Sequence, residues 1–340
     1  MHVDYLIPGL FELPLEELDR DFLCQRLPHI NRLLGLASLR PNHAYTIDAM
    51  WLNALGHQAS AEAGRLAPGL PMAHAFAPGQ PGSRQMLFQA IHLKPDMHSA
   101  LILPIENTEE NRNDISIIIN DLTGYFKVDC DIKLIDGETY LMDLRGFDVP
   151  LHYPHLLSVL GKSANPYIEQ SRAIMPWYQL LNEMQMYLHQ HPLNAERVNN
   201  GSLAINSLWC WGAGPLQQPA RRPHCYCDDF LFRGFASSLG LQASKLSQLD
   251  LKTEGIDVLV MDLRLLQALK SMQQQPLSEL LLDMDETLFK PLMARLDRGL
   301  SSFQLCAGFT SDLALNRFSR YRFWRKAKSI REWMTQQHDY

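Results

Sequence analysis

The chain has 340 residues, a formal net charge of −6 at pH 7, and 46% hydrophobic against 20% charged residues. This composition is typical of a globular protein and excludes a disordered or fibrous chain, and the length favours one large domain plus a smaller one. The negative charge opposes generic attraction to nucleic acid or to an anionic membrane surface.

The first segment of the chain predicts a strand, a helix and a long loop. Tyr5–Pro8 is a short apolar run typical of a strand, and it has no basic region before it that would indicate a signal peptide. Leu27–Leu34 has proline at a helix start and apolar residues at helical spacing. Ala67–Gly82 is rich in Pro, Gly and Ala, which indicates a loop or a boundary. No run approaches the roughly 20 apolar residues that span a bilayer, so we expect a cytoplasmic protein.

The middle of the chain predicts a small α+β unit followed by a long helix. The unit combines two strands, a helix and a hairpin that turns at Asp136-Gly137. The long amphipathic helix would then return the chain to the larger domain. In chain order these elements are Met86–Leu93, Ser99–Leu103, Asn111–Phe126, Asp131–Leu144 and Ile168–Gln190.

Residues 191–214 join four structural signals in one run. His191-Pro192 ends the preceding helix, because proline lacks an N–H and clashes with the previous turn. Asn199-Asn200-Gly201 is a turn signal. Leu203–Trp211 is apolar and bounded by turns, as a buried strand is, and Gly212-Ala213-Gly214-Pro215 ends it.

The last third of the chain alternates predicted strands and helices, which is the pattern of an α/β protein. The sequence therefore predicts a three-layer α/β core with a largely parallel sheet and a small inserted α+β domain. We expect residues 1–85 and 166–340 to form the core and residues 86–165 the insert. The alternating elements are Leu231–Leu239, Val258–Met261, Leu281–Leu296 and Ser302–Cys306.

The 191–214 run resembles the end of the insert and the return to the core in archaeal-type cofactor-independent phosphoglycerate mutases, which belong to the alkaline phosphatase superfamily. It is more similar still to the bacterial RpfE-type regulatory proteins, which share that layout, and Phe323-Trp324-Arg325 also fits their pattern. The resemblance covers the whole chain and implies an alkaline-phosphatase-like fold. In active relatives it implies a Ser or Thr nucleophile beside two divalent metals held by Asp and His.

The metal ligands of the resembled enzymes have no counterpart in this sequence. Where relatives carry an Asp-Gly pair after the first strand, this chain has Pro8-Gly9, and Gly308–Asp312 lacks their Asp-His pair. No histidine follows Asp262 until His338. A hard cation without carboxylates or imidazoles has little reason to bind, so we expect no metal and no cofactor.

The cysteines do not supply a metal site or a disulfide framework. They mostly stand singly in apolar surroundings, as reduced core residues do. His224–Asp229 could hold zinc only with a second ligand pair, and a strand leading into a turn is the simpler interpretation. The six residues are Cys24, Cys130, Cys210, Cys225, Cys227 and Cys306.

Thr46 is the weak candidate for a nucleophile. If Leu52–Gly56 matches the helix behind the nucleophile of the resembled family, that position falls near Ile47, and Thr46 is one residue away. A threonine ahead of a helix is more often an N-cap, so both roles stay open.

A ligand site is predicted beside the glycine-rich turn. Gly212 and Gly214 follow a strand, and exposed N–H groups in such a turn favour anions. Asn194, Arg197 and Asn206 could line the same crevice, where open α/β sheets bind ligands. The alternative is that these side chains satisfy backbone groups at a domain junction.

The segment from Arg317 to Arg331 has seven cationic residues and no acidic one, with aromatic residues between them. This pattern fits nucleic acid or an anionic ligand, but also cationic stems packed over a core. In the structural role, which we favour, Phe318, Phe323 and Trp324 are buried and the arginines pair with carboxylates.

The sequence thus predicts a non-catalytic regulatory or ligand-sensing protein on a phosphoglycerate-mutase-like scaffold that lacks the two-metal site. Its expected partners are a small phosphorylated or anionic ligand and a regulatory protein, with nucleic acid and membrane not expected. One alternative is an active phosphotransferase or mutase with an altered site. A second is a nucleic-acid-binding regulator that uses the basic segment.

Overall fold

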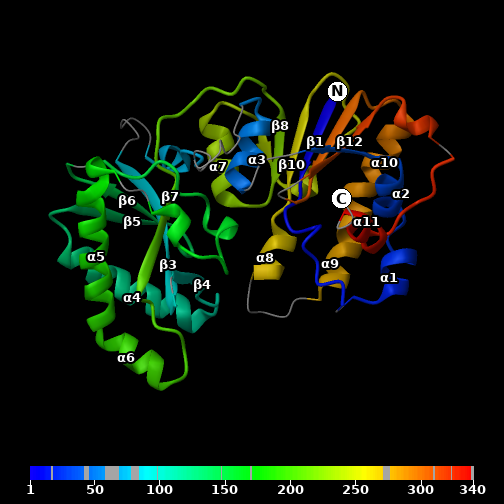
Figure 1. The fold of residues 1–340 in the computed structure, drawn as a ribbon. Helices are drawn as coiled ribbons and strands as arrows, with labels where there is room; N and C mark the ends of the chain where they lie inside the picture. The colour runs from blue at the N-terminus through cyan, green and yellow to red at the C-terminus, as the bar shows by residue number, and fades with distance from the viewer. Residues whose placement is uncertain are drawn as a thin grey trace.

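A computed structural model describes residues 1–16, 18–41, 46–57, 69–77, 84–97, 99–146, 148–168, 171–270, 276–308, 311–322 and 324–337. Two β-sheets lie side by side and each has its own covering helices (Figure 1). The prediction of a mixed α/β protein with a largely parallel sheet is confirmed by the strand pairing.

The larger sheet has seven strands in the order β2-β12-β11-β1-β10-β8-β9. β1 is central and pairs in parallel with β10 on one side and β11 on the other. β8 and β9 continue the parallel part, while β12 and β2 form an antiparallel edge. The bounds are β1 His2–Leu6, β2 Ser38–Pro41, β8 His224–Cys227, β9 Ala243–Ser244, β10 Val258–Met261, β11 Ser302–Cys306 and β12 Ser311–Asn316.

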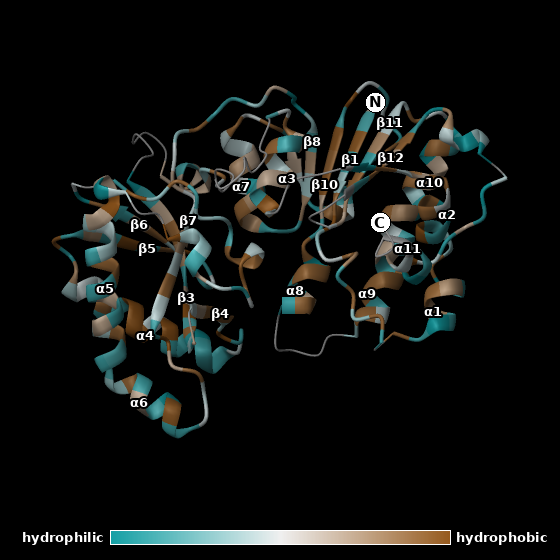
Figure 2. Cartoon of the chain, in the orientation of Figure 1, coloured by the Kyte–Doolittle hydropathy of each residue, from teal (hydrophilic) through white to brown (hydrophobic). Residues whose placement is uncertain are grey.

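Helices cover both faces of this sheet because its strands are apolar on both sides. Val3 and Tyr5 face one apolar cluster and Leu6 faces the other, as the twofold alternation of a strand requires. Figure 2 shows hydrophobic residues concentrated along β10 and on the helices that flank it. The helices of the larger part are α1 Arg20–Gln25, α2 Pro28–Leu36, α3 Ile47–Ala54, α7 Phe230–Ser238, α8 Arg264–Lys270, α9 Leu277–Met284, α10 Lys290–Asp297 and α11 Ile330–Gln337.

The smaller sheet is antiparallel, in the order β4-β3-β6-β5, with β7 paired to β3. The helices of this lobe lie on the left side of Figure 1, around and below the sheet. The strands are β3 Gln85–Asp96, β4 Ser99–Pro104, β5 Cys130–Asp136, β6 Thr139–Leu144 and β7 Ser207–Trp211, and the helices are α4 Glu109–Tyr125, α5 Met175–Gln190 and α6 Pro192–Asn199.

β7 belongs to the smaller sheet, whereas it was expected in the larger one. The long helix before it was expected to return the chain to the core from residue 166, yet Leu87–Ile91 of β3 pairs with Ser207–Trp211. The crossing to the larger sheet therefore comes after β7, in residues 212–223. A short apolar run signals burial but does not specify which sheet buries it. The division into domains stays a prediction.

Two predicted helices differ in the structure, because one begins later than expected and the other is interrupted by a helical turn of a different type. The expected Ile168–Gln190 helix begins as α5 only at Met175, with Pro176 in its first turn. The expected Leu281–Leu296 helix is α9 and α10 joined by a π-helical turn, η6 Asp285–Phe289. The 3₁₀ turns are η1 Met72–Ala75, η2 Leu156–Ser158, η3 Asn165–Tyr167, η4 Arg172–Ile174, η5 Leu246–Gln248 and η7 Ser319–Tyr321.

Two further findings concern the burial of the cysteines and the search for a membrane-spanning helix. All six cysteines are free thiols, and all but Cys24 are buried, as the predicted core residues are. Within the described ranges, no helix has the length and apolar character needed to cross a membrane.

Candidate functional site

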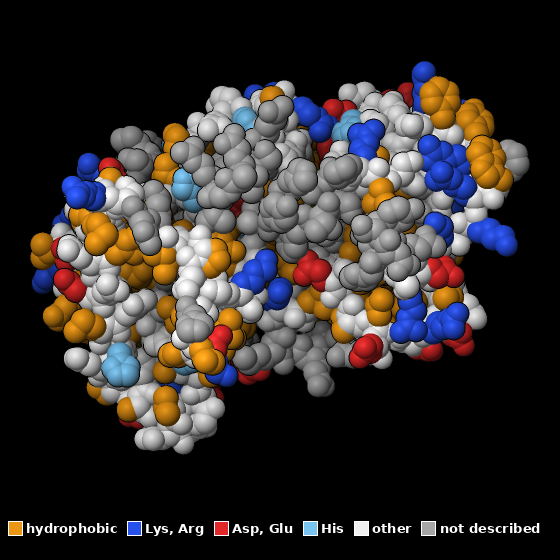
Figure 3. Space-filling model, in the orientation of Figure 1, with side chains coloured by type: hydrophobic (Ala, Val, Ile, Leu, Met, Phe, Trp, Pro, Cys, Tyr) orange, Lys and Arg blue, Asp and Glu red, His pale blue; other side chains and the backbone are white. Residues whose placement is uncertain are grey.

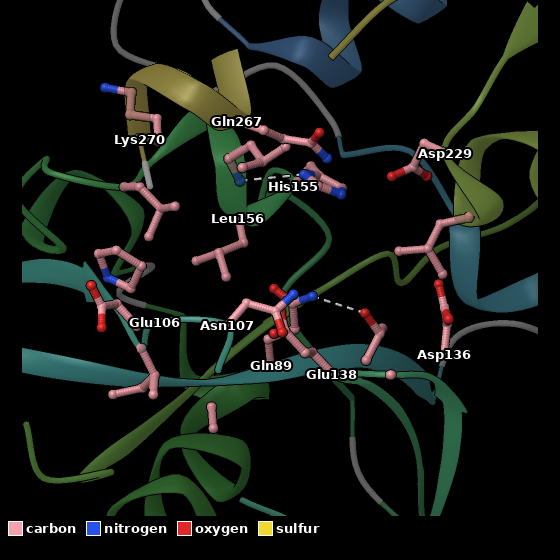
Figure 4. Close-up of a pocket in the computed structure, with 18 of the residues that line it drawn as sticks. Gln89, Glu106, Asn107, Asp136, Glu138, His155, Leu156, Asp229, Gln267 and Lys270 are labelled. Carbon is pink, nitrogen blue, oxygen red and sulfur yellow. Dashed lines mark hydrogen bonds between the residues drawn. The ribbon is translucent and has the colours of Figure 1, made fainter. Parts of the chain in front are cut away.

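A cavity of about 610 Å³ lies between the two sheets. In Figure 4, Gln267 and Lys270 of α8 lie on one side of it and Gln89, Glu106, Asn107 and Glu138 of the smaller lobe on the other. A second, adjoining hollow reaches the carboxyl ends of β8 and β10. Ligands of open α/β sheets bind at the carboxyl ends of the strands, so this is the candidate site.

The two aspartates after β8 are engaged in holding local backbone. Asp229 is the N-cap of α7, and its Oδ1 accepts a hydrogen bond from Phe232 N at 3.0 Å. Asp228 Oδ1 accepts one from Leu246 N, also at 3.0 Å. Burial raises the pKa of Asp229, and hydrogen bonds from the backbone N–H groups of Phe232 and Leu231 oppose that shift. Asp229 nevertheless lines the cavity, on the same side as Asp136 in Figure 4.

The aspartate after β10 is enclosed by an arginine. Asp262 is fully buried, and Arg264 donates to both of its carboxylate oxygens from Nε at 3.0 and 3.1 Å and from Nη2 at 2.7 Å. The backbone N–H of Arg264 adds a bond of 3.0 Å to Oδ1. Arg264 Nη1 also contacts Asp283 of α9 at 2.6 Å. A guanidinium thus occupies the position beside Asp262 that a bound cation would need.

His155 contributes a neutral ring to the cavity wall. Its backbone N–H donates to Asp48 Oδ2 at 2.8 Å, and its Nδ1 accepts from Leu157 N at 3.3 Å. Burial lowers the pKa of His155 to about 4, and the nearby Asp48 carboxylate opposes the shift. Because Nδ1 is an acceptor, the proton of the neutral ring is on Nε2. Nε2 has no hydrogen-bond partner among the described residues and is available to a ligand.

The lining carries an excess of acidic groups. Glu106, Asp136, Glu138 and Asp229 line the cavity, whereas Lys270 and the already paired Arg264 are its cations. Burial raises the pKa of Glu138, with Asp136 adding to the shift and Arg112 opposing it. The amides of Gln89, Asn107 and Gln267 add donors and acceptors. Such a lining favours a ligand with amine or hydroxyl groups over a phosphorylated one.

Thr46 is the N-cap of α3. Its Oγ1 accepts a hydrogen bond from Ala49 N at 3.1 Å, and its side chain is buried. Thr46 does not line the cavity between the sheets. The N-cap role is therefore present in the structure, and a nucleophilic role stays a prediction without support from this geometry.

We expect Thr46→Ala to lower the free energy of unfolding by about 1 kcal/mol, because it removes a cap acceptor from α3. Thr46→Ser keeps the oxygen and should stay close to the parent protein in urea unfolding. An alanine variant of unchanged stability would show that the cap contributes nothing.

Asn194, Arg197 and Asn206 bond to backbone at the far end of the smaller lobe. Asn194 Nδ2 donates to Leu188 O at 2.7 Å and to Ile205 O at 2.8 Å. Arg197 donates from Nε and Nη2 to Leu203 O and from Nη1 to Asp114. Asn206 extends the ladder by accepting from Leu93 N at 2.7 Å. These contacts correspond to the structural alternative for the three side chains.

Gly212 and Gly214 lie at the other end of β7. Both have positive φ values, +82° and +129°, which favour glycine. Gly212 O accepts from Ala73 N at 3.0 Å, so the turn joins η1 to the smaller sheet. β7 separates this turn from Asn206 by five residues, about 16 Å of strand. The structure does not bring the five predicted ligand residues together, and none of them lines the cavity. Their binding role stays a prediction.

The sequence predicted that the positions of the relatives' metal ligands hold no ligands here. Within the described parts of the chain, no group of three or more His, Cys, Asp or Glu side chains is placed to hold a metal ion. Phe309 and Thr310 lie outside those parts. His224–Cys227 is strand β8, as the simpler interpretation predicted, and His224 Nε2 lies 2.9 Å from Ser244 Oγ.

Comparison with protein-family models gave no match, and comparison with curated proteins gave none. The solved structures that match this chain include the following two. The PH0037 protein from Pyrococcus horikoshii has 13% identity and a TM-score of 0.48, with 98% of this chain and 92% of that chain covered. A cofactor-independent phosphoglycerate mutase from Thermoplasma acidophilum has 15% identity and a TM-score of 0.39, with 93% and 89% covered. With TM-scores below 0.5, these similarities carry no argument here. The fold described above is assigned from this chain's own strand pairing.

The sequence analysis singled out none of the polar residues on which the candidate site depends, among them His155, Gln267 and Glu138. His155 stands between Pro154 and Leu156 in a segment without regular periodicity, and no motif signals it. Asp228-Asp229 had a usable signal, because an acidic pair directly after a predicted strand falls at the ligand edge of a parallel sheet.

Proposed function

We propose that this protein is a ligand-sensing regulatory protein that binds a small polar ligand between its two sheets and does not transfer phosphoryl groups through two metals. The scaffold we assign to it is of the phosphoglycerate mutase type, close to the RpfE-type regulatory proteins that the 191–214 run resembles. The observation that carries the proposal is the Asp262–Arg264 pair at the carboxyl end of β10.

The residues at this edge do not fit a two-metal centre. Such a centre needs carboxylates and imidazoles whose lone pairs are open to cations. Pro8 after β1 offers none, and both oxygens of Asp262 are taken by Arg264. Asp228 and Asp229 each use one oxygen to hold backbone N–H groups. The tethered guanidinium would also repel a divalent cation.

The cavity instead offers directional polar contacts. His155 Nε2–H can donate to a ligand oxygen, and Gln267 and Asn107 can donate or accept. Glu138 and Asp136 would favour an amine near the smaller sheet. A volume of about 610 Å³ is in the range of small-molecule sites. These features support an amine-bearing or polyhydroxylated ligand.

The test is a thermal-shift screen with two ligand classes, amines and aminosugars against phosphorylated metabolites, with and without Mn²⁺. We expect the first class to raise the unfolding temperature, since binding to the native state stabilises it. We also expect no turnover of phosphoglycerates with added Mn²⁺.

Glu138→Gln and Gln267→Ala should abolish the shift, whereas Gln217→Ala, at an exposed position away from the cavity, should preserve it. Turnover that depends on Mn²⁺ would establish the phosphotransferase alternative. A shift that survives both cavity substitutions would place the ligand elsewhere.

A further inference from the structure

The segment between β12 and α11 presents exposed aromatic side chains. Phe318 is 58% exposed, Tyr321 54% and Trp324 68%. The burial expected for Phe318 and Trp324 is therefore wrong, and Phe323 lies outside the described residues. Figure 3 shows hydrophobic side chains beside Lys and Arg side chains at the upper right end of the molecule. We call Arg317, Phe318, Arg320, Tyr321, Trp324, Arg325 and Lys326 the basic aromatic face.

Several arginines of this segment bond to neutral groups among the described residues. Arg322 Nη1 donates to Leu36 O at 2.8 Å and to Ser38 Oγ at 2.9 Å, and Arg325 Nη1 donates to Ala37 O at 3.2 Å. Arg320 Nη1 donates to the backbone oxygen of Asp297, whose carboxylate pairs with Arg32. Among the described residues, no cation of the basic aromatic face forms an ion pair, so the expected pairing with carboxylates is also wrong. No described carboxylate compensates their positive charge.

A tight turn holds two of the rings in place. Phe318 N donates to Asn316 Oδ1 at 2.9 Å, and Asn316 N donates to the hydroxyl of the buried Ser319 at 3.1 Å. Phe318 and Tyr321 are three residues apart across η7, a spacing that puts side chains on one side of a 3₁₀ turn. Arg317 and Arg320 each lie 4.7 Å from the centre of the following ring. The rings and charges are thus arranged before any partner binds.

We propose that the basic aromatic face binds single-stranded nucleic acid. Exposed rings stack on unpaired bases, and adjacent guanidinium and ammonium groups neutralise phosphates, which together are the means of sequence-tolerant single-strand binding. The face carries four of the chain's cations and no acidic residue of its own segment. The acidic remainder of the protein weakens this attraction little, because charges are screened beyond about 10 Å at 0.1 M salt. This inference does not depend on the ligand cavity.

The experiment is fluorescence anisotropy with labelled single-stranded RNA and DNA of about ten nucleotides. We expect binding that weakens steeply between about 50 and 200 mM salt. Replacing Phe318, Tyr321 and Trp324 with Ala should lower affinity at least about tenfold, because stacking on each ring is lost. Arg317→Gln with Lys326→Gln should reduce the slope of log affinity against log salt by about 1.4.

The matched controls are on the smaller lobe. Tyr125→Ala removes a ring that is 69% exposed, and Lys127→Gln with Lys133→Gln removes two exposed charges. Both should leave affinity unchanged, and all variants should keep the parent unfolding temperature. Duplex of the same sequence should bind more weakly, since its bases are stacked on one another.

Three results would overturn the proposal. These are equal binding of duplex and single strand, retained affinity in the triple alanine variant, and binding to phosphatidylserine vesicles without binding to either oligonucleotide. The last would assign the face to an anionic membrane surface.

Discussion

Arg264→Met should lower the free energy of unfolding by about 3 kcal/mol. Asp262 is fully buried, and the substitution leaves its carboxylate with the backbone N–H of residue 264 and no cation. Removing one partner of a buried ion pair costs about 3–5 kcal/mol, because the other charge stays desolvated. The lower end applies here, since the Arg264 side chain is 35% exposed and water can reach the gap.

Urea unfolding of a double-mutant cycle measures the effect. Asp262→Asn combined with Arg264→Met should recover most of the loss, because no charge then stays buried. Arg145→Met is the matched control. Its pair with Asp131 is exposed on both sides, so the cost should stay below about 1 kcal/mol. Equal losses for Arg264→Met and Arg145→Met would mean that Asp262 is solvated and that its carboxylate is open to a cation.

Acid should destabilise the protein through His155. Burial lowers the pKa of this ring from 6.5 to about 4 in the folded protein. Between these values the unfolded chain binds a proton that the folded protein does not, so stability falls as pH drops below 6.5 and levels off below about 4. The shift corresponds to a loss of about 3 kcal/mol between pH 7 and pH 4.

The comparison is with His155→Gln, which keeps the backbone N–H donated to Asp48. Urea unfolding at several pH values should show a loss in the parent protein about 3 kcal/mol larger than in the variant. Burial also raises the pKa of Asp48, with His155 opposing, and this acts in the reverse direction. Both proteins retain Asp48, so the difference between their curves reports mainly His155. Parallel curves would show that the ring is solvated or already charged.

The central strands of the larger sheet and several of its helices could be predicted, because their signals are local. Val258–Met261 and Ser302–Cys306 are apolar runs between turns, and both are strands with the predicted bounds. Asp229 precedes an apolar helix and caps it. The hairpin at Asp136-Gly137 follows from its turn residues.

Features that depend on distant partners could not be predicted. The pairing of β7 with β3 joins residues more than a hundred positions apart. The exposure of Phe318 and Trp324 depends on how the segment after β12 crosses the sheet edge, since a basic-aromatic run can be buried or exposed. The residues of the candidate site were predicted less well than the strands and helices. His155 and Gln267 come together with Glu138 only through packing of the two sheets.

The central place of β1 affects the order in which the chain can fold during synthesis. His2–Leu6 leaves the ribosome more than 250 residues before its two neighbours, residues 258–261 and 302–306. The smaller sheet, by contrast, has all its strands once residue 211 has emerged. Domains generally fold as units as they emerge, and pairing across long sequence separations is slow. The apolar strand β1 therefore stays without its partner strands until residues 258–306 have been translated. During this period we expect a chaperone to bind it.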